Sequence, residues 1–369
     1  MTYVKTVAAV AGVTAAGLVT RAAWGVLSAI GASAAAIQPY AAGTMNYRNG
    51  KFHNTEAGTP VTPSISLLGA AFTQRAAGRP AAAVPLSTPL APVDAAELAV
   101  TWYGHASALL EIDGHRVLFD PVWSRRVSPT TLMGPARLHP VPVALEAVPR
   151  LDAVVISHDH YDHLDKSTVV RLARERDVVF VVPVGVGAHL RRWRVPDARI
   201  VELDWGASTI VGGVTVTCTE ARHFSGRGLT RDATLWSSWV VSGPTRRAYF
   251  GGDTGYGRCF AEVGSAHGPF DVTLLPIGAY DSHWPDIHVT PEEAVTAHAD
   301  LCADPGHGML VPIHWATFNL AFHPWAEPPR RLLAAADSVG SAVSVPRPGQ
   351  RLDVLADPVR EPWWDLGSS

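Results

Sequence analysis

The sequence predicts an α/β protein in which sheets are layered against amphipathic helices. Residues 153–156 form a short, wholly apolar run, which is typical of a strand buried on both faces of a sheet. Residues 164–176 have the apolar spacing of a helix, and residues 178–182 form a second buried strand directly after it. This alternation indicates sheets whose faces are covered by helices. With 369 residues, 47% of them hydrophobic, the chain can bury a large core.

Turn and capping signals place the other elements. Residues 98–112 and 115–119 are expected to be extended and to be joined by the Asp-Gly turn at 113–114. The Thr-Pro-Glu-Glu sequence at 290–293 combines an N-cap, a proline in the first turn and a capping box, so it predicts a helix to about residue 301. The other predicted strands lie near 199–203, 208–220, 235–242, 246–251, 271–276 and 308–313.

Composition divides the chain into three parts. Residues 1–45 contain apolar runs, interrupted by Arg21, that are each shorter than the roughly 20 residues needed to span a bilayer. Three interpretations stay open: a secretory signal, an uncleaved anchor or interfacial helix, or an Ala-rich helix packed on the body. The first two predict a protein that is exported or associated with a membrane, including its cytoplasmic face. Residues 46–98, rich in Pro, Ala, Gly and Ser, are expected to be an irregular covering segment, and residues 99–369 form the main domain.

Net charge and cysteine content exclude some classes of protein. The formal net charge is −3, so no overall positive charge indicates a nucleic-acid partner. The three cysteines lie far apart and form no CxxC pair, which argues against a disulfide framework. The 16 histidines are more informative because many of them lie beside Asp, Gly and aromatic residues in the second half of the chain.

Four potential metal ligands follow the apolar run 153–156 within six residues: His158, His160, Asp162 and His163. A lone histidine here would more often be an ordinary surface or core residue. Alternate residues of an extended backbone point the same way, so His158 and His160 can share one ion while the other two turn toward a second. Imidazole and carboxylate groups suit zinc and similar divalent ions. The sequence therefore predicts two divalent metal ions, with zinc as the best match.

The cluster resembles the HxHxDH signature of the metallo-β-lactamase superfamily. The resemblance implies a four-layer αββα sandwich with the metal site at one edge of the sheets. It also implies three later ligands, and His223, Asp253 and His314 each follow a predicted strand in that order. Each of these alone could be a polar loop residue or a helix cap. By this likeness the ligands of one ion are His158, His160 and His223, those of the other are Asp162, His163 and His314, and Asp253 bridges the two.

The physical chemistry of such a pair of ions favours hydrolysis. Two divalent ions about 3.5–4 Å apart can lower the pKa of a bridging water and neutralise charge on a phosphoryl group. A metal-bridging hydroxide is therefore the expected nucleophile, and no serine or cysteine nucleophile is needed. Gly251 and Gly252 are expected to let the backbone come close to the metals without Cβ clashes.

A closer likeness, over roughly residues 46–330, is to the family of phospholipases D that hydrolyse N-acylphosphatidylethanolamine. The matching segments are residues 51–54, 101–107, 119–124, 133–135, 157–165, 275–280, 288–294 and 314–318. The resemblance implies hydrolysis of the phosphodiester on its headgroup side, which gives an N-acylethanolamine and phosphatidic acid. The lipid-facing segments of that family have no clear match in residues 77–90.

The same likeness assigns roles around the metals. His288 matches a family histidine near the metals and the substrate phosphate, so it is a candidate for charge stabilisation or proton transfer, together with Asp162 as the second catalytic candidate. A polar residue just before a helix is the plainer interpretation of His288. Asp120 is expected to orient a ligand histidine, or else to form a turn before Pro121. His105 is expected to support the ligands or the fold.

The leading hypothesis is thus a metal-dependent phosphodiesterase of phospholipase D type, with a phospholipid substrate and a membrane surface as its partner. The alternative is a lactonase or general ester hydrolase that acts on small soluble substrates with the same ligands, which are common to related branches. A third hypothesis is a membrane-tethered binding protein without activity. The complete set of seven ligands argues against it. The oligomeric state does not follow from the sequence.

Overall fold

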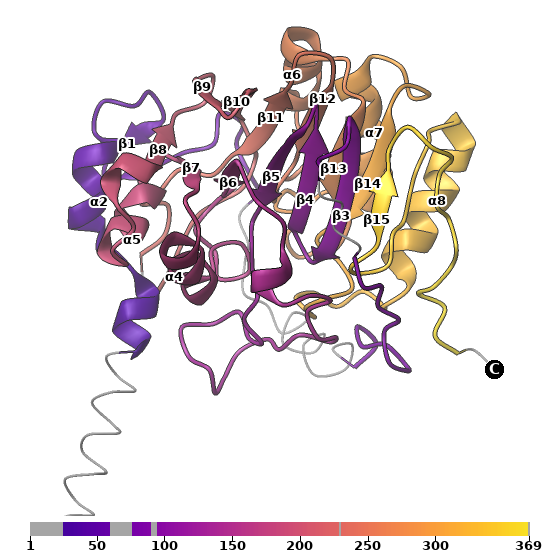
Figure 1. Cartoon of the computed structure of the whole chain (residues 1–369), viewed down its shortest axis with the longest axis horizontal. Coiled ribbons are helices and arrows are strands. Elements are labelled where there is room, and N and C mark those ends of the chain that lie inside the picture. Colours follow the sequence, from indigo (N-terminus) through magenta and orange to yellow (C-terminus); the bar gives the residue numbers. More distant parts are fainter. Residues whose placement is uncertain (1–24, 60–75, 90–93, 229, 368–369) are drawn as a thin grey trace, which may run out of the picture.

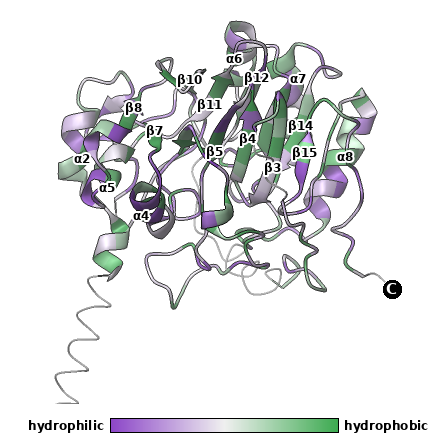
Figure 2. Ribbon diagram, in the orientation of Figure 1, coloured by the Kyte–Doolittle hydropathy of each residue, from purple (hydrophilic) through white to green (hydrophobic). Residues whose placement is uncertain are grey.

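In a computed structural model of the chain, residues 25–59, 76–89, 94–228 and 230–367 are described. They form two facing sheets in the middle of the molecule, with helices on both outer sides (Figure 1). This arrangement is the four-layer αββα sandwich that the sequence predicts. Apolar residues concentrate in the strands, whereas the outer sides of the helices carry more polar residues (Figure 2).

The first sheet has seven strands in the order β15-β3-β4-β5-β6-β7-β8. Its strands are β3 (Leu98–Gly104), β4 (Ser107–Ile112), β5 (His115–Phe119), β6 (Ala153–Val155), β7 (Val179–Pro183), β8 (Ile200–Leu203) and β15 (Arg351–Asp353). The pairs from β15 to β5 are antiparallel, and those from β5 to β8 are parallel. The carboxyl ends of β5 to β8 therefore lie at one edge.

The second sheet has six strands in the order β14-β13-β12-β11-β10-β9. Its strands are β9 (Ser208–Val211), β10 (Val214–Thr219), β11 (Ser238–Ser242), β12 (Arg247–Phe250), β13 (Val272–Pro276) and β14 (Met309–Ile313). Strands β12, β13 and β14 are parallel, so their carboxyl ends also share an edge.

Helices cover the outer faces of both sheets. The helices are α2 (Ala34–Ala41), α4 (Lys166–Glu175), α5 (Val186–Arg192), α6 (Cys259–His267), α7 (Pro291–Cys302) and α8 (Glu327–Val339), with short 3-10 turns η1 (Leu145–Ala147) and η2 (Asp197–Arg199). Helices α4 and α5 pack on the seven-stranded sheet. Helix α7 packs on β13 and also contacts α6 and α8.

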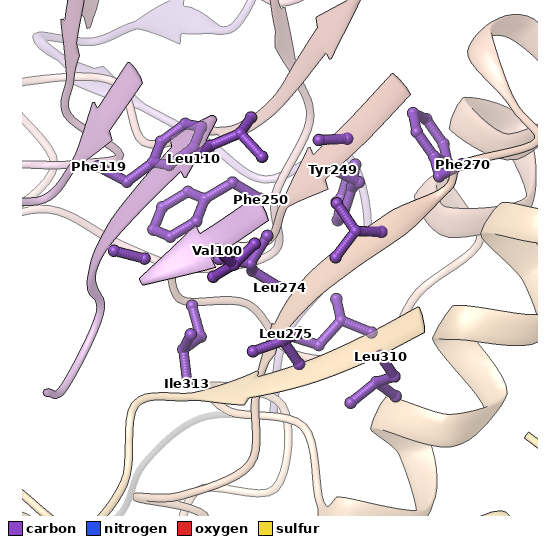
Figure 3. Packing of buried hydrophobic residues seen from close by; sticks show 14 of the residues in the cluster. Val100, Leu110, Phe119, Tyr249, Phe250, Phe270, Leu274, Leu275, Leu310 and Ile313 are labelled. Atoms are coloured by element: carbon purple, nitrogen blue, oxygen red, sulfur yellow. The ribbon is translucent and has the colours of Figure 1, made fainter. Parts of the chain in front are cut away.

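The largest part of the core lies between the sheets and follows from alternation along the strands. On β5, Phe119 points inward while Leu118 points toward α4 and α5. Phe119 stacks on Phe250 of the opposite sheet, with ring centroids 4.3 Å apart and planes inclined by 7° (Figure 3). Burying a side chain of this size contributes about 1.5–3 kcal/mol, so these rings fix how the two sheets face each other.

Most predicted helices and strands are confirmed, but two predicted segments are each split into two strands and several elements were not predicted. The predicted extended segment 98–112 is two strands that turn at residues 105–106, and segment 208–220 divides at residues 212–213. Helix α7 begins with the expected capping box at Thr290. Helices α5, α6 and α8 and strand β15 were not predicted. Helix α6 is short and contains a glycine, so its helical signal is weak. Helix α8 has prolines in its first turn and is rich in Leu, Ala and Arg, so its signal was present in the sequence and was overlooked.

The amino-terminal part is described only from residue 25. Residues 1–24, which hold most of the predicted apolar runs, lie outside the described residues. Residues 25–30 are helical, and α2 packs on α5 through Ile37 and Ala188. In the part of the chain that the structure describes, no helix is both long and apolar enough to cross a membrane. Residues 47–52 form a small hairpin of β1 (Tyr47–Arg48) and β2 (Lys51–Phe52).

Candidate metal centre

Strand ends from both sheets converge at the edge that carries the candidate ligands. The loop with the HxHxDH sequence follows β6, His223 follows β10, Asp253 follows β12 and His314 follows β14. Backbone hydrogen bonds join the sheets there: His314 N donates to His105 O at 2.9 Å, and Ser237 N donates to Ser157 O at 2.9 Å. The edge is thus a fixed platform on which side chains distant in sequence meet.

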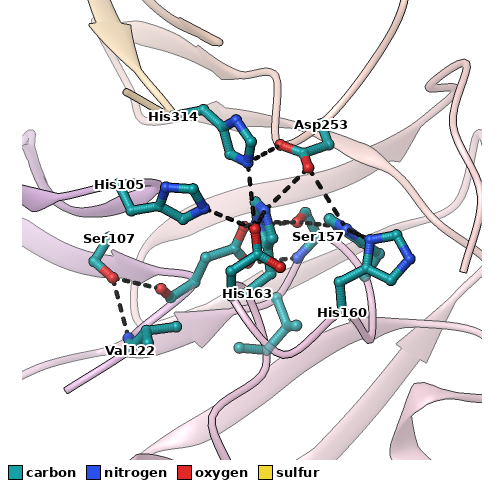
Figure 4. A network of polar contacts seen from close by, with 12 residues as sticks. His105, Ser107, Val122, Ser157, His160, His163, Asp253 and His314 are labelled. Carbon is teal, nitrogen blue, oxygen red and sulfur yellow. Dashed lines mark hydrogen bonds and ion pairs between the residues drawn. The ribbon is translucent and has the colours of Figure 1, made fainter. Parts of the chain in front are cut away.

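The structure brings all seven predicted ligands together in two groups. Within each group, ligand atoms lie within 4.8 Å of one another. The first group is His158, His160, His223 and Asp253, and the second is His105, Asp162, His163 and His314; Asp253 and His314 also form a third group with His288. Figure 4 shows members of both groups and the contacts between them. Apart from His105, the first two groups contain the residues that the likeness assigns to the two ions, and the assignment itself stays a prediction.

Asp253 lies between the two groups. Its Oδ2 is 3.7 Å from His223 Nε2 and 3.8 Å from His158 Nε2 in the first group. The same oxygen is 3.1 Å from His163 Nε2, and Oδ1 is 3.1 Å from His314 Nε2, both in the second group. Asp253 therefore faces histidines of both groups, as the predicted bridging ligand must; the bridging role itself stays a prediction.

Unpartnered donor atoms show that these groups fit divalent cations. Nε2 of His163, His223 and His314 and Oδ1 of Asp253 are buried and make no regular hydrogen bond among the described residues, although Nε2 of His163 and of His314 each lie 3.1 Å from an Asp253 oxygen. Four buried ligand atoms that converge without regular hydrogen bonds are unusual in a purely structural cluster. Nitrogen and oxygen ligands of this kind suit zinc and similar ions.

The charges in the metal-free protein divide the histidines into two kinds. Burial lowers the pKa of His158 and of His223 well below the usual value, so both are neutral and ready to bind a cation. Burial acts in the same direction on His163 and His314, but the carboxylate of Asp253 outweighs it. It raises the pKa of His163 well above the usual value and that of His314 to about 9. These two rings hold a proton where a cation would bind.

Asp120 and His105 form hydrogen bonds to predicted ligands without being predicted ligands themselves. Asp120 Oδ2 accepts a hydrogen bond from His163 Nδ1 at 2.7 Å, which leaves the other ring nitrogen facing Asp253. The same oxygen accepts from the Ser157 hydroxyl at 2.6 Å, and Oδ1 accepts from Ser157 N at 2.7 Å. His105 Nε2 lies 2.8 Å from Asp162 Oδ2. Both residues thus have the position expected of groups that orient ligands.

His288 lines the centre from the segment before α7. Its ring stacks on that of His314, with centroids 5.1 Å apart, and its Nδ1 is 3.9 Å from Asp253 Oδ2. That nitrogen has no hydrogen-bond partner among the described residues. Burial lowers the pKa of His288 to about 3, so the ring is neutral. The structure therefore brings this residue to the place where the likeness predicted it.

Backbone geometry at the centre is unusual. His105, Asp120 and His314 have positive φ angles of 52°, 38° and 61°, a conformation that costs non-glycine residues roughly 1–3 kcal/mol. Gly252 has φ 58°, and a Cβ there would lie 2.6 Å from Ser157 Cβ. The close approach at Gly252 is thus to Ser157, directly before the HxHxDH sequence, and the predicted approach of this backbone to the metals stays a prediction.

Several supporting residues were missed in the sequence. Asn54 binds both sides of the His223 backbone: its side chain donates to His223 O at 2.8 Å and accepts from His223 N at 3.1 Å. Asp159, inside the HxHxDH loop, accepts from Gly226 N at 2.7 Å and lies 3.3 Å from His189 Nε2. Asn54 is the last residue of segment 51–54, which resembles the phospholipase D family, so this likeness could have pointed to it. Nothing in the sequence pointed to His189.

A cavity of about 270 Å³ opens onto the ligand atoms. It is lined by His160, Asp162, His223, Phe224, Arg231, Asp253, Ala279, Trp284, Ile287, His288, His314 and Leu320. A larger cavity of about 770 Å³ lies behind the HxHxDH loop, between residues 25–29 and 124–132. We place the chemistry in the smaller cavity because only that one of the two reaches the unpartnered ligand atoms.

Two groups of His and Asp at the shared edge of an αββα sandwich define a metal-dependent hydrolase of the metallo-β-lactamase superfamily. The chain belongs to this superfamily, since residues 115–315 match the family described as the beta-lactamase superfamily domain. An uncharacterised protein of Mycobacterium tuberculosis is 55% identical over 351 residues, 94% of each chain. The N-acyl-phosphatidylethanolamine-hydrolyzing phospholipase D 1 of Caenorhabditis elegans is 39% identical over 235 residues, 60% of this chain and 65% of the relative.

Solved structures agree on the fold. An isothiocyanate hydrolase from Delia radicum gut bacteria superposes with a TM-score of 0.55 at 19% identity and covers 70% of this chain and 100% of its own. A metallo hydrolase from Ignicoccus hospitalis gives 0.53 at 21% identity and covers 69% and 97%. At these identities the likeness concerns the fold and leaves the substrate open.

Proposed function

We propose that the protein is a dinuclear, zinc-dependent phosphodiesterase of phospholipase D type that hydrolyses N-acylphosphatidylethanolamine-like lipids. The observation that carries the proposal is the 39% identity to the C. elegans phospholipase D that is named for this substrate. The products would be an N-acylethanolamine and phosphatidic acid. Two paired ligand groups support the proposal because an anionic phosphodiester needs strong charge neutralisation during hydrolysis.

The seven ligands would hold two divalent ions. One ion would be held by His158, His160 and His223, the other by Asp162, His163 and His314, with Asp253 between them. When bound, such ions lower the pKa of a water molecule and neutralise charge on phosphoryl oxygens. The carboxylates contribute because burial, which raises their pKa, is outweighed by nearby histidines such as His163, so Asp162 and Asp253 stay ionised.

His288 and Asp162 are the proposed catalytic residues that the chain itself supplies. His288 is neutral and lines the cavity. A neutral imidazole donates one hydrogen bond and accepts another, so His288 is suited to contact a phosphoryl oxygen or to carry a proton to the leaving group. Asp162 lines the same cavity, and its Oδ2 accepts a hydrogen bond from His105, which orients the carboxylate.

The size of the cavity limits which part of a lipid can enter it, and exposed side chains indicate how the protein would contact a membrane. A cavity of about 270 Å³ accommodates a phosphate and a headgroup but not two acyl chains. In the loop after β5, Leu132 and Met133 are 82% and 70% exposed, and Arg125 and Arg126 lie on the same loop. Exposed apolar and cationic side chains of this kind favour contact with an anionic membrane surface. The chains of the substrate would then stay in the bilayer.

Incubation of the purified, zinc-loaded full chain with N-acylphosphatidylethanolamine tests the proposal. We expect release of N-acylethanolamine and phosphatidic acid, measured by mass spectrometry, and its loss after chelation. The His288→Gln variant should keep its zinc content and lose about 10²- to 10⁴-fold in kcat. Turnover of a soluble lactone without any release of N-acylethanolamine would overturn the proposed substrate.

A lactonase or ester hydrolase is the second candidate. The observation that favours it is the same small cavity, whose volume of about 270 Å³ is enough for a small soluble substrate. The Asp253→Ala variant distinguishes both enzymes from an inactive binding protein. It should lose metal and activity together if the protein is a hydrolase, whereas binding of a ligand that does not need the metal should survive.

A further inference from the structure

One cationic side chain stands at the mouth of the metal centre and has no assigned role. Among the described residues that line the 270 Å³ cavity, Arg231 is the only lysine or arginine. It is exposed to solvent, and in the described part of the chain no carboxylate lies within 4.0 Å of its guanidinium. The neighbouring Asp232 carboxylate feels this charge without forming an ion pair, so the guanidinium stays available to a ligand.

Backbone and ring contacts hold Arg231 close to the ligands. An isolated β-bridge pairs Arg231 with Gly226 across a tight loop. The guanidinium carbon lies 4.2 Å from the ring centroid of Phe224, as in a cation–π contact. The ring of Phe224 in turn lies 4.6 Å from that of His160 and 4.7 Å from that of His223. One aromatic ring therefore separates the positive charge from the first ligand group.

The positive charge of Arg231 would distinguish lipids by the charge of their headgroup. A zwitterionic phospholipid carries an ammonium group two carbons from its phosphate oxygen, whereas in an N-acylated lipid an amide replaces it and the headgroup is neutral. With the phosphate at the ligand groups, an ammonium would lie near the guanidinium of Arg231 and would be repelled by it. An anionic phosphodiester would be attracted.

We propose that Arg231 is a specificity-determining residue that favours phosphodiesters of net negative charge and disfavours those with an ammonium headgroup. The proposal rests on the proposed function because it concerns the substrate of the same site. A charge pair about 8 Å apart, with a dielectric constant between water and a protein surface, changes a rate or affinity by about 2- to 30-fold. Salt reduces this effect because Arg231 is exposed.

The test compares two lipids that differ at the headgroup nitrogen. The ratio of kcat/KM for N-acylphosphatidylethanolamine to that for phosphatidylethanolamine is measured in the same neutral micelles. We expect Arg231→Gln to lower this ratio about 2- to 30-fold and Arg231→Glu to lower it further, while Arg231→Lys largely retains it. The control is Arg174→Gln, which removes an exposed arginine at the end of α4, outside the cavity. An unchanged ratio in Arg231→Glu would overturn the proposal.

Binding of inorganic phosphate to the zinc-loaded protein gives a readout that does not depend on lipid turnover. Isothermal calorimetry should show phosphate binding about 2- to 30-fold weaker in Arg231→Glu and unchanged in Arg174→Gln. If the wild type hydrolyses no phospholipid, the proposed function fails, yet phosphate affinity still decides the role of Arg231. Equal phosphate affinity in the wild type and Arg231→Glu refutes the charge effect.

Discussion

Replacing Asp120 by Asn removes one charge from behind the metal centre and changes almost no volume. Asp120 is fully buried, and its two oxygens accept hydrogen bonds from His163 Nδ1, Ser157 N and the Ser157 hydroxyl. An amide offers only one acceptor oxygen. If its NH₂ faces Ser157 N, two donors oppose each other. If it faces His163, that ring must accept at Nδ1, so the proton moves to the nitrogen that should bind the metal.

The size of the effect follows from these contacts. Losing a partner that orients a ligand histidine typically costs 10- to 100-fold in metal affinity, or about 1.4–2.7 kcal/mol. The hydrogen bond from His163 is 2.7 Å long and buried, so we expect the Asp120→Asn variant to lose affinity in this range. The second ligand group should weaken more than the first, because His163 belongs to it.

Competition between the protein and a chelating dye for Zn²⁺ measures the two affinities. The matched control is Asp152→Asn, which alters a carboxylate at the opposite end of the same pair of strands, where it accepts from Arg116 N at 2.8 Å. Thermal unfolding of both metal-free variants separates loss of fold from loss of metal. Zinc affinity within two-fold of the wild type in Asp120→Asn, as in the control, would refute the reasoning.

Four other predictions follow from the structure. Metal loading at pH 7.5 should release about two protons, because His163 and His314 are protonated in the metal-free protein and bind metal only when neutral; calorimetry in buffers of different ionisation enthalpy measures this, and loading without proton release contradicts it. Since the folded pKa of His314 is raised to about 9, its protonation stabilises the metal-free protein below about pH 6.5, and this stabilisation is lost as the pH rises through 9; a melting temperature that does not fall over this range argues against it. Gly252→Ala should lower the free energy of unfolding by about 1–3 kcal/mol in urea, because a Cβ meets Ser157 in a left-handed conformation. Thr290→Ala should cost about 1 kcal/mol by removing the cap of α7, and an unchanged urea midpoint would show that the cap contributes nothing.

Local chemistry made much of the fold predictable. The capping box at Thr290 and the apolar run before His158 each depend on neighbouring residues, and both predictions were confirmed as a helix start and a buried strand. Helices α5 and α6 escaped prediction because tertiary packing, of α5 on β7 and β8 and of α6 on α7, rather than a strong local signal stabilises them. The same is true of β15, which is only three residues long and pairs with β3 from more than 200 residues away. Helix α8, which packs on α7, has a local signal that was overlooked.

The sequence by itself determined the chemical identity of the centre, because ligand type and spacing are local properties. It indicated that His158, His160, Asp162 and His163 share one loop, and the family likeness added three ligands from later strand ends. Only the tertiary structure showed that these residues converge, that His105 and His288 lie among them, and that Arg231 lines the same cavity. The physical reason is that parallel strands from two sheets end at one edge, and no local pattern specifies which loops that edge brings together.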